Sequence, residues 1–310
     1  MGLVTAAIMG PWIAHSVTPA EPARSGTHEA ATGDGQRSGP DEGGFRREIE
    51  IAGYAGGPWY YRSDVHLTRP DGTDLVLKRL GWDGDALYFP IDGGVRSVEW
   101  WGSFGLMIDF LHNKAIARLG RGAHGRKLAN PVVEDADVAG TLKGERVEKR
   151  VKLTDVFERL EFTHGHNTLL LTPLIRTLPI TPSVTPYFGF GVGVALPHVE
   201  VWFPGDDKSK RTSEYQYAGP AGQFLAGLEL RSGRMSYFIE YKFMVASIDA
   251  ALTGEESWKN WNIFGDMWNQ FMRWREGKEA PHGRLSTTLA THTVVGGAGY
   301  WTRWGAAKPR

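Results

Sequence analysis

Histidine and carboxylate side chains recur at the ends of several hydrophobic segments of this sequence. The segment PHVEV places His198 and Glu200 two residues apart, and FTHGHN contributes His164 and His166. If PHVEV is a β-strand, His198 and Glu200 lie on one face, as two ligands of one ion require. Imidazole and carboxylate groups that converge from several strands can hold a divalent transition metal, or can act as general acid and base.

Further ionisable residues could be brought to the same end of a sheet by neighbouring strands. They are Asp109, His112 and Lys114 in DFLHNKA, Glu161, Glu240 and Lys242 in IEYKF, and His292. An alternative is that these groups form Glu–Lys and Asp–His pairs that only fill the interior of a narrow barrel. Strand alternation does not place Asp109 and His198 together on an inner face, unless Pro197 introduces a bulge.

The elements that must position these residues are short segments whose character alternates with a period of two. The clearest is 185–203, where one face carries large apolar residues and the other mostly small ones. The large residues are Phe188, Phe190, Val192, Val194 and Leu196. Small residues inside and large apolar ones outside suit a narrow barrel whose outer surface meets lipid. A soluble sandwich strand would keep its apolar face inside and its polar face outside.

Alternation of this kind predicts eight strands. They are 47–55, 92–101, 104–110, 159–178, 185–203, 214–230, 236–250 and 285–304. Short turns near Gly102, 179–183 and 231–234 alternate with long connections over 56–87, 119–157, 204–213 and 253–284. Short turns at one end and long loops at the other are typical of bacterial outer-membrane barrels, and closure removes the sheet edges that a bilayer does not tolerate. We therefore predict an all-β, closed, antiparallel up-and-down β-barrel of about eight strands, located in the outer membrane of a Gram-negative bacterium.

Composition agrees with this class. The 310 residues include 40 Gly, 12 Trp, 10 Tyr and 14 Phe, a mixture that favours aromatic-girdled β-structure. The absence of Cys excludes disulfides and thiolate chemistry. The formal net charge of zero gives no basic field for a nucleic-acid partner. The sequence contains no apolar run of 18 residues, which argues against a helical membrane span but not against a barrel.

Both ends of the sequence differ from the region between them. Residues 1–20 resemble the apolar core and exit of a secretory signal, although the basic segment that normally precedes such a core is missing. The alternative is a frayed N-terminus that carries a few apolar residues. Residues 21–46 lack a hydrophobic period and are predicted to be a disordered linker. The barrel is expected over 47–304, and 305–310 form a tail.

Two of the long connections have unusual composition. In 255–276, aromatic residues recur close to a helical period, namely Trp258, Trp261, Phe264, Trp268, Phe271 and Trp274. This pattern predicts an amphipathic helix that lies either in a membrane interface or on the rim of the barrel itself. The segment 143–159 alternates in charge and is interpreted as a solvated extension of a loop.

Several blocks resemble the lipid A oxidase-like family of outer-membrane β-barrels. The blocks are FGLMIDFLHNKA, LEFTHGHNTLLL, TPYFGFGVGVALPHVEV and FIEYKF. Their order and spacing match that family over roughly 48–304. The resemblance implies an eight-stranded barrel whose enzymatic members oxidise the proximal glucosamine of lipid A to a 2-aminogluconate unit. Those members use O2, release peroxide and depend on a divalent metal.

The motif match also indicates site residues, namely Asp109, His112, Lys114, His198, Glu200, Glu240 and Lys242. In this hypothesis a metal is held by His198 and Glu200 with His112 or Asp109. Glu240 removes the proton of the anomeric hydroxyl, and Lys114 or Lys242 pairs with a lipid A phosphate.

Two further functions stay open at this point. One is a non-catalytic envelope barrel that binds lipopolysaccharide or stabilises the membrane. The other is a soluble, lipocalin-like barrel for a small apolar ligand. For the outer-membrane functions we expect lipid A or lipopolysaccharide and membrane lipids as partners, no nucleic acid, and a monomeric barrel.

Overall fold

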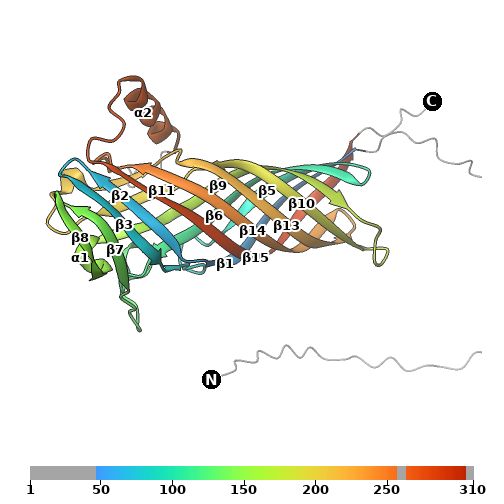
Figure 1. The fold of residues 1–310 in the computed structure, drawn as a ribbon. Coiled ribbons are helices and arrows are strands. Elements are labelled where there is room, and N and C mark those ends of the chain that lie inside the picture. Colours follow the sequence, from blue (N-terminus) through green and yellow to red (C-terminus); the bar gives the residue numbers. More distant parts are fainter. Residues whose placement is uncertain (1–46, 257–262, 305–310) are drawn as a thin grey trace, which may run out of the picture. The chain divides into compact units, whose positions relative to one another are not determined.

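A ring of eight antiparallel strands forms the body of the protein (Figure 1). The computed structural model describes residues 47–256 and 263–304. Within them the ring consists of β1 (Arg47–Tyr60), β5 (Gly93–Trp101), β6 (Phe104–Ala117), β9 (Arg159–Arg176), β10 (Val184–Ala195), β13 (Gly219–Ser232), β14 (Met235–Ala251) and β15 (Arg284–Trp304). β1 pairs with β15 from Arg47↔Trp304 to Tyr60↔Thr291, which closes the barrel. Closure leaves no free edge among these eight strands.

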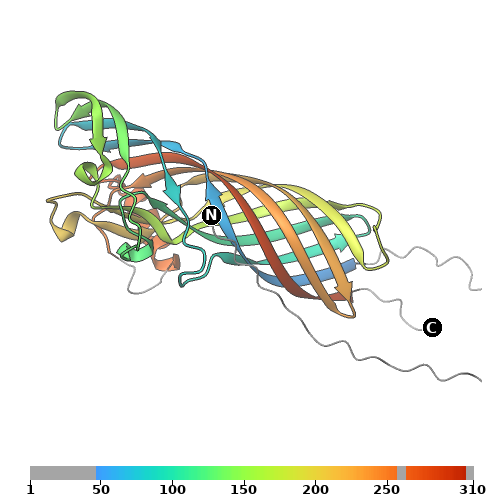
Figure 2. The same ribbon diagram turned by 90° about the horizontal axis from the view of Figure 1, so that it is seen from below.

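The remaining elements lie in the long connections, at the end of the barrel opposite its short turns (Figure 2). The strands among them are β2 (Ser63–Arg69), β3 (Thr73–Leu80), β4 (Trp82–Asp83), β7 (Asp135–Leu142), β8 (Glu145–Lys152), β11 (His198–Trp202) and β12 (Thr212–Tyr215). The helical elements are α1 (Leu153–Val156), α2 (Ile263–Arg275) and the 3₁₀ turns η1 (Ala123–Gly125) and η2 (Lys208–Lys210). In bacterial outer-membrane barrels the end with long connections faces outward from the cell.

The eight-stranded ring and its short turns are confirmed, but the predicted strands 185–203 and 214–230 are each broken, into β10 and β11 and into β12 and β13. The long connections are also more ordered than predicted. β2 pairs with β15, and β3, β7 and β8 follow in order, so the sheet continues beyond the barrel. The sequence contains a pattern that indicates β2 and β3, because Val65 and Leu67 and likewise Leu75 and Leu77 are two residues apart. All four side chains are buried in the structure. The charged segment predicted to be a loop contains β8, whose side chains are mostly exposed.

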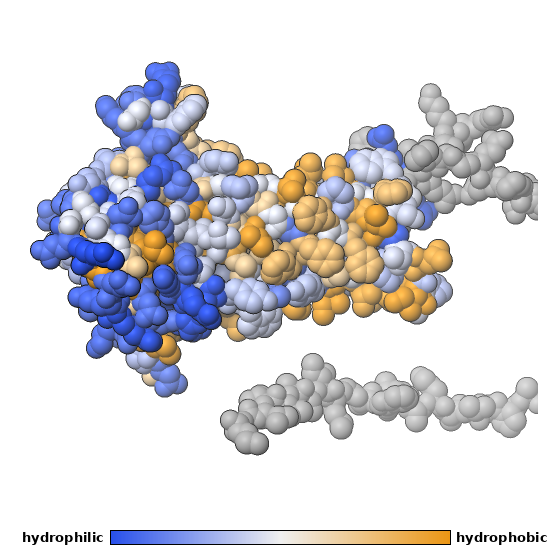
Figure 3. Space-filling model, viewed as in Figure 1, coloured by the Kyte–Doolittle hydropathy of each residue, from blue (hydrophilic) through white to orange (hydrophobic). Residues whose placement is uncertain are grey.

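Large apolar side chains cover the outside of the barrel toward its short turns (Figure 3). On β10 the exposed residues are Phe188, Phe190 and Val192, and on β14 they include Tyr237 and Ile239. The exposed fraction of Phe190 is 66%, and Ile51 on β1 reaches the same value. Such a band of apolar side chains meets the hydrocarbon of a bilayer. We call it the lipid belt.

The inside of the barrel is filled by charged and aromatic side chains. Lys242 forms ion pairs with Asp109 and with Glu240, the latter at 3.1 Å. Arg96 contacts Glu240 at 2.8 Å and Glu50 at 3.0 Å. All five side chains are at most 4% exposed. A buried charge is tolerated when it is paired and hydrogen bonded, and this network meets that condition.

Glycines make room for this filling. Gly227 on β13 lies opposite Tyr187 on β10, whose ring occupies the space of the missing side chain. A Cβ atom on Gly227 would lie 2.4 Å from Cζ of Tyr187, closer than any tolerated contact. The Tyr187 hydroxyl then donates to Glu240 at 2.7 Å, which joins the ring to the charged network.

The long connections form an extension of the barrel, built on the sheet of β2, β3, β7 and β8, and this extension has an apolar core of its own. Its buried residues come from β2, β3, β9, β11 and β15, with Leu77, Phe162, Val199, Val201 and Leu285 among them. Among the described residues, no helix has the length and apolar character needed to cross a membrane. The predicted signal remnant in 1–20, the linker in 21–46, the tail in 305–310, and Trp258 and Trp261 lie outside the described residues.

Candidate metal site on the outer face

A histidine–carboxylate cluster lies where β9 and β11 pair. His124, His164 and Glu200 each offer a ligand atom, and these atoms lie within 4.8 Å of one another. Nδ1 of His164 is 2.7 Å from Oε1 of Glu200, and Nδ1 of His198 is 3.4 Å from the same oxygen. Three imidazole rings therefore surround the carboxylate of Glu200.

The cluster faces away from the interior of the barrel. In β11, Val199 and Val201 point into the apolar core of the extension, so His198, Glu200 and Trp202 occupy the opposite face. On β10 the residues with even numbers, such as Phe188, Phe190 and Val192, face outward. His198, Glu200 and Trp202 continue this outward-facing row on β11. The cluster thus lies on the outer side of the barrel wall, beyond the end of the lipid belt, where neighbouring loops bury most of it.

A break in strand pairing brings His164 beside Glu200. β10 pairs with β9 as far as Ala195↔Thr168, and pairing resumes between β11 and β9 at Glu200↔Glu161. Leu196 and Pro197 form the break, and Pro197 suits it because proline has no N–H for a sheet. The register of β9 against β6 also shifts here, between Asn113 and Ala115.

The imidazole rings are stacked in a row. The ring centroids of His124 and His164 are 4.2 Å apart, and those of His164 and His198 are 4.6 Å apart. Tyr215 of β12 packs edge-on against the far side of His198, at 4.7 Å. His124 comes from η1 and has a φ of +55°, a left-handed conformation that costs energy in most residues.

Arginine completes the cluster. Nη1 of Arg159 lies 2.6 Å from Oε2 of Glu200 and 3.3 Å from Oε1 of Glu161. The guanidinium groups of Arg159 and Arg211 both lie over the Trp202 ring, 3.9 Å and 4.4 Å from its centre. Arg211 also donates to Glu158 at 3.2 Å. Cation–π contacts of this kind fix the orientation of the two arginines.

The electrostatics keep the cluster in the protonation states that a metal ion needs. Burial opposes ionisation of Glu200, but the hydrogen bond from His164, the adjacent His198 ring and the charge of Arg159 hold the pKa of Glu200 well below its usual range. Burial lowers the pKa of His124 to about 4, and the neighbouring His164 adds to this effect. Burial likewise lowers the pKa of His198. These shifts favour a carboxylate at Glu200 beside neutral imidazoles at His124 and His198, as ligation requires.

The cluster opens into a cavity of about 520 Å³. His124, His164 and Glu200 line it together with Arg159, Arg211 and Lys208, and the other lining residues are Phe89, Pro90, Trp202, Ser213 and Glu256. The cavity therefore combines metal-ligand chemistry with three cationic side chains. It can accommodate an anionic headgroup beside an ion.

The donor set fits a divalent transition metal. Two imidazoles and one carboxylate suit zinc, iron, cobalt, nickel or copper better than calcium or magnesium, which prefer oxygen ligands. Both ring nitrogens of His198 are buried and have no hydrogen-bond partner among the described residues. His198 can thus act as a fourth ligand, or can hold Glu200 in place from behind.

The sequence-predicted residues divide into two groups, and this corrects the single site of the sequence hypothesis. His198 and Glu200 belong to the outer cluster. Asp109, Glu240 and Lys242 point into the barrel interior, where they pair with one another, because their positions alternate with the lipid-facing residues of β6 and β14. The geometry therefore does not bring the predicted base and ligand to the histidine cluster.

The other two predicted residues lie near the cluster without joining it. Nδ1 of His112 is 2.9 Å from Oδ1 of Asn167 on β9. Lys114 is fully buried and forms an ion pair with Asp92, in the segment that also carries Phe89 and Pro90 to the cavity. Lys114 thus holds a cavity wall in place, because an unpaired buried charge would be costly.

Sequence reasoning missed His124 and did not select His164 as a ligand. His164 stood in the block FTHGHN, so the signal was present but could not be distinguished from that of His166. In the structure, His166 turns the other way and its Nδ1 lies 3.4 Å from the Tyr60 hydroxyl. His124 lies in a long connection that has no strand alternation to predict its position.

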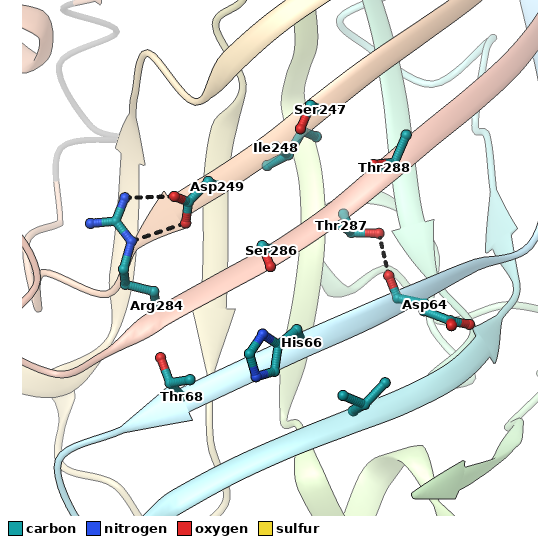
Figure 4. Close-up of a pocket in the computed structure, with 11 residues that line it drawn as sticks. Asp64, His66, Thr68, Ser247, Ile248, Asp249, Arg284, Ser286, Thr287 and Thr288 are labelled. Atoms are coloured by element: carbon teal, nitrogen blue, oxygen red, sulfur yellow. Dashed lines mark hydrogen bonds and ion pairs between the residues drawn. The ribbon is translucent and has the colours of Figure 1, made fainter. Parts of the chain in front are cut away.

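A second cavity, of about 530 Å³, lies on the outer face of β2, β14 and β15 (Figure 4). Two of its charged residues are paired with each other, since Arg284 donates to Asp249 at 2.9 Å and 3.0 Å. The hydroxyl of Thr287 donates to the carbonyl oxygen of Asp64 at 2.8 Å. Serine and threonine supply most of the remaining wall, so this cavity has no comparable group of metal ligands among its lining residues.

The closed ring, the lipid belt and the one-sided connections define an outer-membrane β-barrel. No family model matches the sequence, and a search of curated proteins gave no match. Among solved structures, the outer membrane protein OprG from Pseudomonas aeruginosa is similar, with 13% identity, a TM-score of 0.40, and coverage of 83% of this chain and 96% of that one. Ail, the attachment invasion locus protein of Yersinia pestis, solved with the heparin analogue sucrose octasulfate, gives 10% identity, a TM-score of 0.30, and coverage of 83% and 99%.

Proposed function

We propose that this outer-membrane barrel is an enzyme that oxidises the proximal glucosamine of lipid A to 2-aminogluconate. In this proposal a divalent metal is held by His124, His164 and Glu200, and O2 accepts the electrons. The observation that carries the proposal is the position of the cluster on the outer face, beyond the lipid belt. A lipid headgroup in the outer leaflet can reach that face without entering the filled interior.

The reaction balances as a two-electron oxidation. At the anomeric carbon, a C–H and an O–H bond break and a C=O bond forms, and water then opens the resulting lactone to the acid. The two electrons and two protons reduce O2 to hydrogen peroxide. A bound metal supplies Lewis acidity and electron transfer at this step. The substrate class in this proposal is inferred from the sequence resemblance, whereas the metal ligands are inferred from the residues that line the cavity.

The protein side chains have separable roles in this proposal. Arg211 and Lys208 bind the anionic headgroup in the cavity, because both line it and neither forms an ion pair with Glu200 as Arg159 does. Arg159 neutralises Glu200 and stays stacked on Trp202. His198 supports the Glu200 carboxylate from the buried side. The proposal assigns no chemical role to Asp109, Glu240 or Lys242.

The test is mass spectrometry of lipid A from a Gram-negative host whose lipid A has a free anomeric hydroxyl, and which expresses the protein in air or without oxygen. We expect an added oxygen atom in lipid A only in air, with peroxide released in equal amount. His164→Ala should abolish this product. His66→Ala is the matched control, since His66 is exposed on β2 and pairs with Asp74 outside the cluster.

Metal analysis of the same purified proteins separates catalysis from binding. We expect one equivalent of metal in the wild type and in His66→Ala, and a clear loss in His164→Ala. Unmodified lipid A in cells that contain the folded, metal-loaded barrel would refute the oxidase proposal. That result would favour the alternative, a non-catalytic barrel that binds lipopolysaccharide through its cationic cavity.

A further inference from the structure

The helix α2 docks on the barrel through its polar face. A carboxylate oxygen of Asp266 accepts the backbone N–H of Tyr215 at 2.9 Å. The Gln270 side chain bonds both the N–H and the carbonyl oxygen of Tyr217, at 2.8 Å and 2.9 Å. Arg273 forms an ion pair with Glu214 at 2.8 Å. These residues recur at i, i+4 and i+7, so they form one stripe of the helix.

The opposite stripe of α2 is aromatic and exposed. The exposed fraction is 84% for Phe264, 63% for Trp268, 46% for Phe271 and 63% for Trp274. Successive rings contact one another, with centroids 5.7 Å apart for Trp268 and Phe271. A surface helix of a soluble protein turns its apolar stripe toward the core, and α2 does the reverse. Its aromatic stripe therefore requires an apolar partner outside the described chain.

The surroundings of α2 identify that partner as lipid. A groove of about 610 Å³ lies beside the polar contacts of the helix, between α2 and the outer side of β13 and β14, and Met267, Phe271 and Trp274 line its helical side. Pro220 of β13 lines its opposite side and lies on the same outward row as Phe224 of the lipid belt. The groove is thus continuous with the surface that the bilayer covers.

We propose that α2 is a membrane-interface helix whose aromatic stripe enters the outer leaflet, with lipid chains filling the groove beneath it. Tryptophan and phenylalanine on an amphipathic helix, with basic residues such as Arg275 nearby, favour the boundary between headgroups and hydrocarbon. Because α2 also contacts β12 beside the histidine cluster, it would fix the depth of the cavity relative to the leaflet. This inference does not depend on the oxidase reaction.

The experiment uses single-cysteine spin labels on the full chain, which contains no native Cys. Trp268→Cys places the label on the aromatic stripe, and Asn269→Cys is the matched control on an exposed neighbouring position outside that stripe. The barrels are folded into vesicles of phosphatidylethanolamine and phosphatidylglycerol. Heat-dependent mobility on electrophoresis verifies that both variants are folded. Collision rates of the label with O2 and with a water-soluble nickel chelate are then measured.

We expect the ratio of O2 to nickel collisions to be several-fold higher at position 268 than at 269, because O2 concentrates in hydrocarbon. Equal, water-like ratios at both positions would overturn the proposal. Shielding of position 268 from both reagents would also overturn it, since that pattern indicates contact with protein, such as a second copy of the chain. Neither outcome affects the lipid A measurement, so the two proposals can fail separately.

Discussion

Nδ1 of His164 lies 2.7 Å from Oε1 of Glu200, although the two residues come from strands whose regular pairing is interrupted between Thr168 and Glu161. A continuous ladder would not produce this contact, because His164 would then occupy the inner face with Phe162 and His166. The irregularity in β9 is therefore what assembles the cluster. Local breaks in a barrel wall often serve to aim a side chain in this way.

The Glu200 carboxylate should dominate the affinity of the cluster for a metal ion. Glu200→Gln keeps the shape but removes the negative charge that contacts two imidazoles and Arg159. We expect affinity for Zn²⁺ or Co²⁺ to fall by more than about 10- to 100-fold, because that is the cost of losing a residue that only supports a ligand, and Glu200 is a ligand itself. Isothermal titration of the metal-stripped barrel measures this change.

A matched control for that experiment is Glu148→Gln on β8. Glu148 is exposed, and its nearest charged partner, Arg146, is 3.8 Å away. This variant should bind metal as the wild type does. Equal affinities for all three proteins would show that the ion, if any binds, is not held by Glu200.

The interior pair of Lys242 and Asp109 should matter for stability and not for metal content. Lys242→Met leaves the buried carboxylates of Asp109 and Glu240 without their ammonium partner. We expect the free energy of unfolding to fall by about 3–5 kcal/mol, as when one partner of a buried pair is removed. Urea unfolding of the barrel in bilayers gives this value, and metal analysis should show no change.

The double variant Lys242→Met with Asp109→Leu sharpens the argument. Removing both charges should recover part of the lost stability, because an apolar pair does not leave an uncompensated ion. If the stability loss of the double variant equals the sum of the losses of the two single variants, the assigned pairing of Lys242 with Asp109 is contradicted.

Close packing at Gly227 should be sensitive to a single methyl group. Gly227→Ala forces the Tyr187 ring away from β13, and such overpacking costs about 1–3 kcal/mol. Gly222→Ala on the same strand is the control, since its nearest neighbour is a backbone oxygen at 3.5 Å. A thermal or urea midpoint that drops equally in both variants would mean that the general cost of replacing glycine, and not the Tyr187 contact, is responsible.

The carboxyl group of Glu214 should make stability depend on pH. Burial raises the pKa of Glu214 to about 7, against the opposing effects of Arg273 and Thr253, whereas its ordinary value is 4.5. Between pH 4.5 and 7 the native state therefore holds a proton that the unfolded chain has lost. The contribution of this group to the free energy of unfolding falls as pH rises through that interval.

Glu214→Gln isolates this effect, because other groups also titrate in the same range. We expect the wild type to lose stability relative to Glu214→Gln between pH 5 and pH 8. The unfolding midpoint of the variant should therefore rise relative to that of the wild type over this interval. A difference that stays constant with pH would exclude Glu214 as the titrating group.

The barrel itself was predictable because its signals are local. Alternation over 185–203 assigns each side chain to a face, and the structure places Phe188, Phe190 and Val192 outside, as predicted. The additional strand β8 was missed because charged residues dominate it, and β7 was missed because its buried face consists only of Ala136 and Val138. Their pairing is determined by contact with β3, which the sequence of the hairpin does not reveal.

The site was predictable only in part, for a physical reason. His198 and Glu200 share a face by simple spacing, and this holds in the structure. They lie on the outer side of the barrel wall, because they continue the outward-facing row of β10. The hypothesis placed them at one site with Asp109, which lies on the inner side of the wall. The contact with His124 depends on a turn with a φ of +55°, which strand patterns do not encode.

The placement of the cluster on the outer row of β11 has a kinetic consequence. A lipid that reaches this site diffuses in two dimensions, so encounter frequency depends on its mole fraction in the leaflet and not on its bulk concentration. If the site turns over a lipid, diluting that lipid with inert detergent or phospholipid at constant total concentration should lower the rate. A water-soluble fragment of the same headgroup would not show this surface dilution.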